Sequence, residues 1–281
     1  MRFLILGDLH GALPKIHFKE FDAVIFPGDF CSFEGRDILF KIPREKWHIP
    51  WYNIVGRKKA KEMIKRDVER GRKVLEKLNK LNAPVFIVPG NIDYYGNSAF
   101  LKEYYEWKFY RTNFYKNLIK QFPNIKDCHF KQRKFKGITI IGYGLSSSPD
   151  YPIYAKRPYT KEQKRRIKLS DLFLKKLQKL FKKAKAPVIF LSHNVPYNTK
   201  LDKIINKSSP MNGKHFGSII TRRIIEKYKP LICIAGHMHE HLGKCRIGKT
   251  VVVNAGFGPD KNILLEIKGN KIKRLEFHPK P

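Results

Sequence analysis

The sequence is short of acidic residues for a chain with so many basic ones. Only 24 Asp and Glu stand against 58 Lys and Arg in 281 residues, which gives a formal net charge of +34. Most cations therefore have no acidic partner within the chain, so an anionic ligand is expected, with nucleic acid the foremost candidate partner. The alternative is that the lysine-rich segments are ordinary solvated faces. Hydrophobic residues make up 42%, enough for a sizeable core, and this excludes a wholly disordered chain.

Paired cysteines and long hydrophobic runs are also missing. The four cysteines are scattered and form no CxxC pair, which is typical of reduced thiols in a cytoplasmic protein. The longest apolar stretches, such as residues 187–191, have the length of a strand and are far too short to span a membrane. The apolar run Phe3–Leu6 is followed by Asp8 and is too short for a signal peptide. We therefore expect a cytoplasmic protein that does not associate with membranes.

Short apolar runs recur along the chain, and several end at a glycine or serine followed by a polar residue. Because they do not alternate with polar residues, they predict strands buried on both faces, as in an α/β sheet. These runs are 3–6, 23–26, 85–88, 138–141, 188–191 and 231–234. Three further runs, 251–253, 263–267 and 272–277, predict a closing antiparallel set in which Gly269-Asn270 forms a hairpin turn.

Helical spacing of apolar residues lies between some of these runs. It predicts helices within 60–81 and 167–184, and a third over 219–228 with Ser218 as N-cap. No repeat or interdomain linker is evident. We expect one domain over residues 1–281, with insertions near 31–56, 94–135 and 145–160.

Polar residues that can bind metal ions follow the predicted strands. The carboxyl ends of strands in an α/β sheet form the edge at which ligands bind. Two carboxylates, one amide and four imidazoles are suited to two divalent ions such as Mn²⁺, Fe²⁺, Ni²⁺, Co²⁺ or Zn²⁺, and no thiolate is among them. Taken singly, each residue is more often a turn residue or a structural histidine. The set comprises Asp8, His10, Asp29, Asn91, His193, His237 and His239.

Five sequence blocks that contain these residues resemble those of the calcineurin-like metallophosphoesterases, in the same order. Each block is weak alone, whereas five in order, each after an apolar run, are specific. The stretch from His215 to His239 is similar to the prokaryotic, Icc-related branch of that superfamily. The resemblance implies a four-layer αββα sandwich. The blocks are Gly7-Asp8-Leu9-His10-Gly11, Gly28-Asp29, Gly90-Asn91-Ile92-Asp93, Ser192-His193 and Gly236-His237-Met238-His239-Glu240.

The resemblance also implies a division of roles among the ligands. Asp29 would bridge two metal ions, of which manganese is the first choice and Fe, Ni, Co or Zn the alternatives. The implied reaction is hydrolysis of phosphodiesters, with phosphomonoesters as a further candidate substrate, through a hydroxide that bridges the metals. Asn91 and His193 would then be catalytic as well as ligating. The first ion would be bound by Asp8, His10 and His239, and the second by Asn91, His193 and His237.

One position departs from the family pattern. Many members have a histidine after the asparagine, which protonates the leaving oxygen, whereas this chain has Ile92. An isoleucine cannot donate a proton, so we expect weak action on alkyl monoesters and better turnover of activated phosphodiesters or pyrophosphate-type bonds. His215 is the first candidate for a substitute catalytic donor, and a loop histidine that faces water is the alternative. Asp93 is expected to orient a metal-binding histidine.

Other functions are compatible with parts of the sequence. A nuclease or nucleotide pyrophosphatase would use the basic surface to recruit its substrate. Aromatic residues between 100 and 115, interleaved with cations, could stack bases or simply pack onto the domain. A catalytically idle scaffold is disfavoured because buried ligands without a metal are costly. A protein Ser/Thr phosphatase is disfavoured because Asp29 is not followed by Asp-Arg-Gly.

Overall fold

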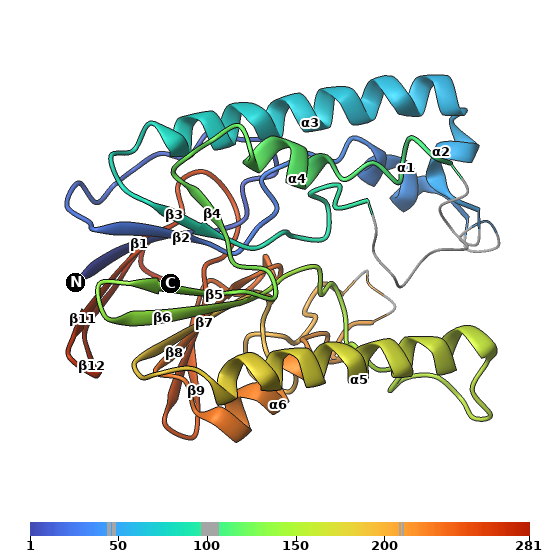
Figure 1. Cartoon of the computed structure of the whole chain (residues 1–281). Coiled ribbons are helices and arrows are strands. Elements are labelled where there is room, and N and C mark those ends of the chain that lie inside the picture. The colour runs from blue at the N-terminus through green and yellow to red at the C-terminus, as the bar shows by residue number, and fades with distance from the viewer. Residues whose placement is uncertain (44–45, 47–48, 97–106, 208, 210) are drawn as a thin grey trace.

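Two six-stranded sheets pack face to face at the centre of the computed structural model (Figure 1). The structure describes residues 1–281 except 44–45, 47–48, 97–106, 208 and 210. The first sheet has the order β12-β11-β1-β2-β3-β4, and the second β5-β6-β7-β8-β10-β9. The strands of the first are β1 (Arg2–Leu6), β2 (Ala23–Phe26), β3 (Val85–Ile87), β4 (Ile125–Asp127), β11 (Asn262–Lys268) and β12 (Lys271–His278). Those of the second are β5 (Gln132–Phe135), β6 (Ile138–Tyr143), β7 (Val188–Asn194), β8 (Ile232–Gly236), β9 (Gly243–Ile247) and β10 (Thr250–Asn254).

Helices cover the outer face of each sheet and complete four layers (Figure 1). The helices α1 (Gly35–Lys41), α2 (Trp51–Ile54), α3 (Arg57–Asn79) and α4 (Phe114–Ile119) lie on the side of the first sheet. The helices α5 (Lys161–Lys182) and α6 (Ile219–Tyr228) lie on the side of the second. The predicted αββα sandwich is therefore confirmed.

Each central strand sends side chains into two apolar layers. In β1, Phe3 and Ile5 enter the core between the sheets, whereas Leu4 and Leu6 pack beneath the helices. In β7, Ile189 enters the core between the sheets, and neighbouring strands alternate in the same way. Both faces exclude water, so each such side chain contributes about 1.5–3 kcal/mol of burial free energy, and the strand needs no polar alternation.

The predicted antiparallel closing set is wrong in one member. β11 and β12 form the expected hairpin beside β1, but β10 lies in the other sheet, parallel to β8. The run 251–253 is fully apolar because it is sandwiched between the sheet core and the helix layer of the second sheet. Apolar content predicted a buried strand without saying in which sheet.

The span 94–135, which the sequence predicted to be an insertion, contributes to the sandwich. Its second half forms β4, which pairs with β3, and β5, which pairs with β6, so these strands are edges of the two sheets. Both strands are short and polar, as half-exposed edge strands tend to be, and therefore left no apolar run to recognise.

The described aromatic residues of that span pack onto the domain. Tyr115 is fully buried, and Trp107, Phe109, Tyr110 and Phe114 lie against the same core beneath α3. For these rings, packing rather than base stacking is their structural role. Phe100, Tyr104 and Tyr105, on which the alternative also depended, lie outside the described residues.

The local helix signals act as expected. The Ser218 side chain caps α6 by accepting a hydrogen bond from the Thr221 amide at 3.0 Å, and Thr160 with Gln163 forms a capping box at the start of α5. Within the described ranges, no helix combines the length and apolar character that crossing a bilayer requires.

Candidate metal centre

Six predicted metal ligands converge at the carboxyl edges of the two sheets and form two groups of three. In each group the candidate ligand atoms all lie within 4.8 Å of one another. We call Asp8, His10 and His239 the first triad, and Asp29, His193 and His237 the second triad. β1 and β2 deliver the two carboxylates from the first sheet, whereas β7 and the turn after β8 supply three imidazoles from the second.

Asp29 stands between the triads. Its Oδ2 lies 3.4 Å from His10 Nε2 and 3.5 Å from His193 Nε2, so one oxygen faces an imidazole of each triad. Its Oδ1 accepts a hydrogen bond from the Ile92 amide at 3.0 Å. Asn91 joins the second triad, because its Oδ1 lies 2.8 Å from His193 Nε2. This is the arrangement that a bridging carboxylate and a fourth ligand would have.

The chemistry of the donor atoms fits divalent cations. Within the described part of the chain, Asp8 Oδ1 is buried without a hydrogen-bond partner, and the buried His10 Nε2 has only the long contact to Asp29. Burying such polar atoms unsatisfied costs free energy that a bound cation would offset. The set offers oxygen and imidazole nitrogen only, which suits Mn²⁺, Fe²⁺, Ni²⁺, Co²⁺ or Zn²⁺.

Two glycines make room for the carboxylates. A Cβ on Gly236 would lie 2.2 Å from Asp8 Oδ1, and a Cβ on Gly90 would lie 1.9 Å from Asp29 Oδ1. Any side chain at either position would displace a candidate ligand. The glycines of Gly90-Asn91 and Gly236-His237 are therefore explained by the close approach of these carboxylates to the backbone.

Three candidate ligands adopt left-handed backbone conformations, with φ of 45° at His10, 55° at Asp29 and 67° at His237. Such conformations cost about 1–3 kcal/mol each for residues other than glycine and occur mostly at functional sites. Local hydrogen bonds stabilise them: the His10 amide donates to the Asp29 carbonyl at 2.9 Å, and the His237 amide donates to Asp8 Oδ2 at 2.7 Å. The backbone is thus arranged to aim these side chains into the site.

The two triads are held in different ways. In the second, His193 Nδ1 lies 2.9 Å from the Pro27 carbonyl and His237 Nε2 lies 3.0 Å from the Ser147 carbonyl. Each bond leaves the other ring nitrogen for a metal and fixes the ring's orientation. In the first, Phe257 stacks on His239 at 4.4 Å and meets His10 edge-on at 5.0 Å. Hydrogen bonds orient one triad and an aromatic ring packs against the other.

Electrostatics also separate the triads. Burial disfavours the charged form of His10, but the hydrogen bond and negative charge of Asp29 outweigh it and raise the pKa of His10 above its usual value. For His237, burial and the nearby His193 lower the pKa to about 3. Asp29 is fully buried, yet the charges of His193 and His10 hold its pKa below its usual range. Asp29 is therefore an ionised carboxylate, ready to bind cations.

Asp93 does not orient a histidine, contrary to the sequence-based expectation. Its carboxylate accepts hydrogen bonds from three backbone amides, those of Asp29 at 2.8 Å, Gly90 at 2.7 Å and Cys31 at 3.0 Å. It thereby ties the loop after β2 to the loop after β3. Burial and the charge of Asp29 raise the pKa of Asp93. The role is positional, because it sets the backbone from which Asp29 projects.

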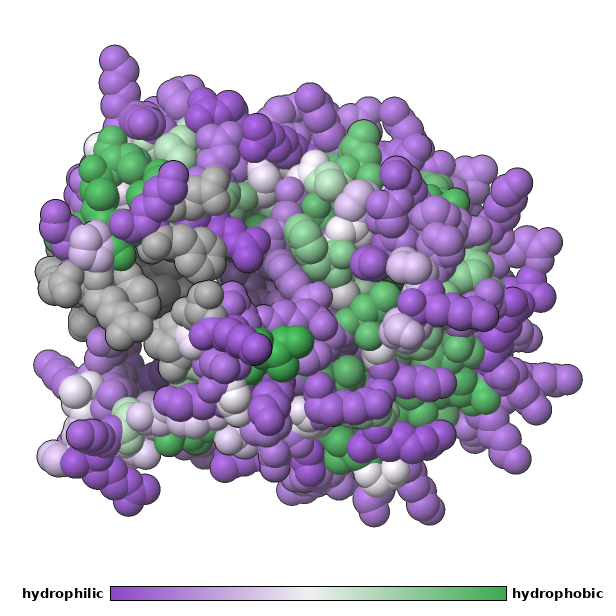
Figure 2. Space-filling view, turned by 180° about the vertical axis from the view of Figure 1, so that it is seen from behind, coloured by the Kyte–Doolittle hydropathy of each residue, from purple (hydrophilic) through white to green (hydrophobic). Residues whose placement is uncertain are grey.

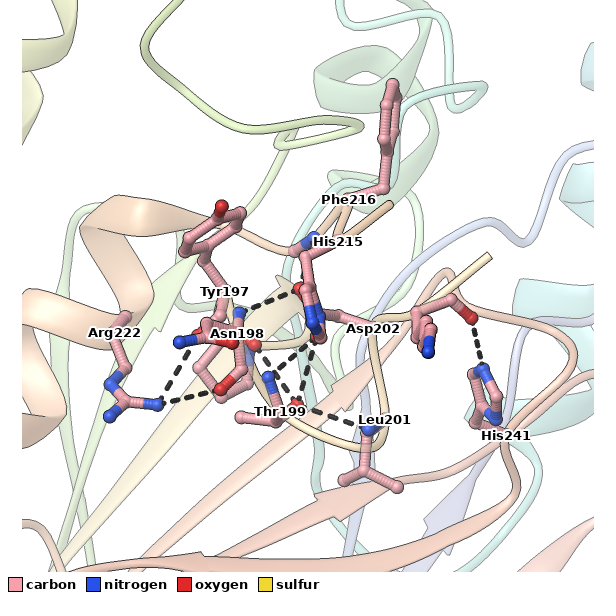
Figure 3. Close-up of polar contacts among 12 residues, drawn as sticks. Tyr197, Asn198, Thr199, Leu201, Asp202, His215, Phe216, Arg222 and His241 are labelled. Atoms are coloured by element: carbon pink, nitrogen blue, oxygen red, sulfur yellow. Dashed lines mark hydrogen bonds and ion pairs between the residues drawn. The ribbon is translucent and has the colours of Figure 1, made fainter. Parts of the chain in front are cut away.

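His215 belongs to neither triad, and its side chain contacts a carboxylate outside both triads (Figure 3). Its Nδ1 lies 2.7 Å from Oδ1 of Asp202, a fully buried carboxylate that also accepts the amides of Asn198, Thr199 and Gly217. His215 precedes a segment that runs parallel to the chain after β7, with Pro196 opposite Ser218.

That segment is hydrogen-bonded to the end of β7, which carries His193, and to the loop whose Ser147 carbonyl contacts His237. Asn194, the residue after His193, donates from Nδ2 to the Phe216 carbonyl at 3.1 Å. The Tyr154 hydroxyl bonds the His215 backbone, and Tyr154 lies in the same loop as Ser147, the partner of His237. His215 therefore lies beside the end of β7 and the loop that contains Tyr154 and Ser147.

Several supporting residues could not be found from the sequence. The carbonyls of Pro27 and Ser147 have no side-chain signal, and Asp202 lies in a loop where no periodic pattern connects it with His215, 13 residues later. Asn254 was recognisable, since it follows a strand. The structure gives it a turn-forming role: its Nδ2 donates to the Met238 carbonyl at 2.7 Å and its Oδ1 accepts the Gly256 amide at 3.0 Å, which supports the turn between His237 and His239.

Comparisons with known proteins agree with this geometry. The family model for calcineurin-like phosphoesterases matches residues 1–241. The chain belongs to the calcineurin-like phosphoesterase family. It is therefore a metal-dependent phosphoester hydrolase of a dinuclear family.

One sequence relative and two solved structures are similar to this chain. Protein MJ1162 of Methanocaldococcus jannaschii is 27% identical over 286 residues, covering 99% of this chain and 97% of the relative. A phosphopantetheinyl hydrolase from Mycobacterium tuberculosis superposes with a TM-score of 0.54 at 12% identity, covering 92% of this chain and 89% of that one. A putative 5'-nucleotidase from Staphylococcus aureus gives 0.51 at 12% identity and covers 99% of this chain but 54% of that one. At these identities the two structures show a shared fold.

Proposed function

We propose that this calcineurin-like phosphoesterase hydrolyses phosphodiesters, using two divalent ions, manganese first among them. The observation that carries the proposal is the position of Asp29, whose Oδ2 faces His10 of one triad and His193 of the other. A single buried carboxylate placed in this way suits two cations held close together. When bound, such ions activate a water nucleophile and neutralise the charge that grows on the phosphoryl oxygens.

The protein's own residues would orient the substrate. Asn91 is exposed and its Oδ1 lies beside His193 Nε2, where both would bind a cation, so its Nδ2 group remains to donate hydrogen bonds to a phosphoryl oxygen. Ile92 follows it, and its amide holds Asp29. Its side chain supplies no proton at the place where many family members have a histidine.

His215 is the residue that we assign to protonate the leaving oxygen. Its Nδ1 is bonded to the buried Asp202, so the proton to be donated lies on Nε2 (Figure 3). A carboxylate partner orients the ring and stabilises the charged imidazole, as in other histidine–carboxylate pairs. Asp202 acts here as a positioning residue.

The substrate class is tested with purified protein, Mn²⁺ and three small substrates that share a chromophore: an aryl phosphodiester, an aryl phosphomonoester and an alkyl aryl diester. We expect kcat/KM to be highest for the aryl diester. Turnover of the monoester above that of the diester would overturn the assignment of substrate class. Parallel titrations with Fe²⁺, Ni²⁺, Co²⁺ and Zn²⁺ identify the preferred ion.

The proton donor is tested through its dependence on the leaving group. His215→Gln is expected to slow release of poor leaving groups by about 10²-fold and of p-nitrophenolate far less, because a good leaving group needs no proton. Ile92→His is expected to rescue the poor leaving groups in that variant. His241→Gln is the matched control, since His241 bonds the Lys203 carbonyl in the same region, at 2.6 Å (Figure 3). An equal loss for all leaving groups in His215→Gln would contradict the assignment.

A further inference from the structure

The outer helices α3 and α5 are both strongly basic and lie on opposite sides of the molecule (Figure 1). Hydrophilic side chains line the upper and lower margins of the molecule, at the levels where these helices lie (Figure 2). The two helices nevertheless differ in what their cations contact.

Four of the ten cations of α3 form ion pairs with acids. Arg72 lies 2.8 Å from Glu69 and 3.2 Å from Glu76, and Lys65 lies 3.0 Å from Glu62. Further pairs join Arg66 and Arg70 to Glu34 and Lys80 to Glu76. Such exposed pairs add little to stability, but they reduce the positive field of this face.

On α5 a row of exposed lysines has no such partners. Their spacing of three, four and seven residues places them on one side of the helix. Lys168 and Lys175 are two helical turns apart, and Leu172, which is 58% exposed, lies between them on the same side. Among the described residues, none of these lysines forms an ion pair with a carboxylate. The lysine row consists of Lys161, Lys164, Lys168, Lys175, Lys179 and Lys182.

The lysine row has the dimensions of a short stretch of nucleic acid. At a helical rise of about 1.5 Å per residue, it extends for about 31 Å. Phosphates of one strand follow one another at about 3.4 Å along a duplex axis, so the row runs beside about nine nucleotides. Regularly spaced cations on one side of a straight helix are suited to a regularly charged polymer.

The beginning of the lysine row is connected to the metal centre. Arg166, in the second turn of α5, donates to Ser148 Oγ at 2.7 Å and to the Asp150 carbonyl at 3.2 Å. The neighbouring Ser147 carbonyl accepts His237 Nε2. The first lysines therefore stand beside the loop that contacts the second triad, and Lys182 lies at the distant end.

The opposite side of α5 is not available for insertion into a membrane. Leu177 and Phe181 are buried against the second sheet and are not available for insertion. Binding of an amphipathic helix to a membrane needs an apolar face beside the cations, and Leu172 alone does not provide one.

We propose that the lysine row of α5 binds the phosphate backbone of a nucleic acid strand and leads it toward the metal centre. Binding of the strand is inferred from the lysine row of α5 and does not depend on catalysis. Only cleavage of the bound strand rests on the proposed phosphodiesterase function. A nucleic acid would then be the polymeric substrate of this enzyme.

Binding is measured by fluorescence anisotropy with a labelled 20-nucleotide single-stranded RNA, in EDTA to prevent hydrolysis, between 50 and 200 mM salt. Six phosphate contacts to a single strand predict a slope of about −4 for log K against log salt, a fall of about 300-fold over this range. The triple variant K168Q/K175Q/K179Q is expected to halve the slope, so that the fall becomes about 20-fold. A DNA duplex of the same sequence, in a second arm, distinguishes the two forms of the polymer.

The matched control removes the same charge from the other helix. K58Q/K73Q/K77Q on α3 is expected to bind within about twofold of the wild type. Equal losses in the two triple variants would overturn the proposal, because net charge alone would then explain binding. Equal affinity for polyglutamate or anionic vesicles would also overturn it. Hydrolysis of the small aryl diester, measured on all three proteins, reports the catalytic function separately and is expected to be unchanged.

Discussion

The two triads of the metal centre use similar residues in different surroundings. In the second, the rings of His193 and His237 are fixed by backbone carbonyls, and burial keeps His237 neutral. In the first, the rings rest against Phe257, and Asp29 favours a proton on His10. The comparison teaches that one half is already arranged for a cation, whereas the other half must exchange a proton for it. We therefore expect the two ions to bind with unequal affinity.

Removing the carboxylate of Asp29 should have the largest effect on activity and metal binding, because Asp29 faces a histidine of each triad. Asp29→Asn is expected to lower kcat/KM for an aryl diester by at least about 10³-fold and to weaken both ions. Metal content by mass spectrometry and diester kinetics in excess Mn²⁺ measure this. Asp260→Asn serves as control, since that exposed carboxylate pairs with Lys15, at 2.9 Å, and belongs to neither triad. Retention of both ions in Asp29→Asn would contradict a bridging role.

Single histidine variants should separate the two sites. Calorimetric titration of the wild type with Mn²⁺ is expected to show two steps, the tighter by about 10–100-fold, because outer hydrogen bonds pre-orient the second triad. His193→Ala should abolish the tight step and His10→Ala the weak one. Melting temperatures of the metal-free variants show whether they fold. Loss of the tight step in His10→Ala would reverse the order of the sites.

Acid should empty the triads in sequence. The pKa of His10 is raised above its usual value, so a proton competes with the metal there at a higher pH than at an ordinary histidine, whereas His237, with a pKa of about 3, remains neutral. Affinity at the first triad is therefore lost first as the pH decreases from about 7.5 to about 5.5. Metal retained after dialysis at graded pH values measures this. Simultaneous release of both ions would contradict the electrostatic difference.

The smallest expected effect comes from the ring that packs on the first triad. An aromatic pair contributes about 0.5–1.5 kcal/mol, so Phe257→Ala should weaken the weaker ion by about 2–10-fold and leave the tighter ion unchanged. Phe257→Tyr keeps the ring and should bind as the wild type does. A change in the tight step of the Mn²⁺ titration would show that Phe257 supports both triads.

Much of the site was predictable because strands buried on both faces leave a clear mark. An apolar run such as Phe3–Leu6 that ends in Gly7-Asp8 reports both a buried strand and the turn at its carboxyl end. Six of the seven candidate ligands come together in two triads, and Asn91 contacts His193 beside them. The sequence did not predict that β10 lies in the second sheet, because an apolar run does not show which strand it pairs with. It also did not predict the edge strands β4 and β5, because their polar residues form no apolar run.

The sequence by itself determined which strands are buried, which residue types end them and where the family's proton donor is missing, at Ile92. Only the tertiary structure decided that Asp93 holds backbone amides, that Asp202 orients His215 and that the lysines of α5 lack the acidic neighbours found on α3. The physical reason is the distance along the chain over which each kind of interaction acts. Burial and turn formation depend on neighbours in the chain, whereas hydrogen bonds and ion pairs join residues that the fold alone brings within about 3 Å.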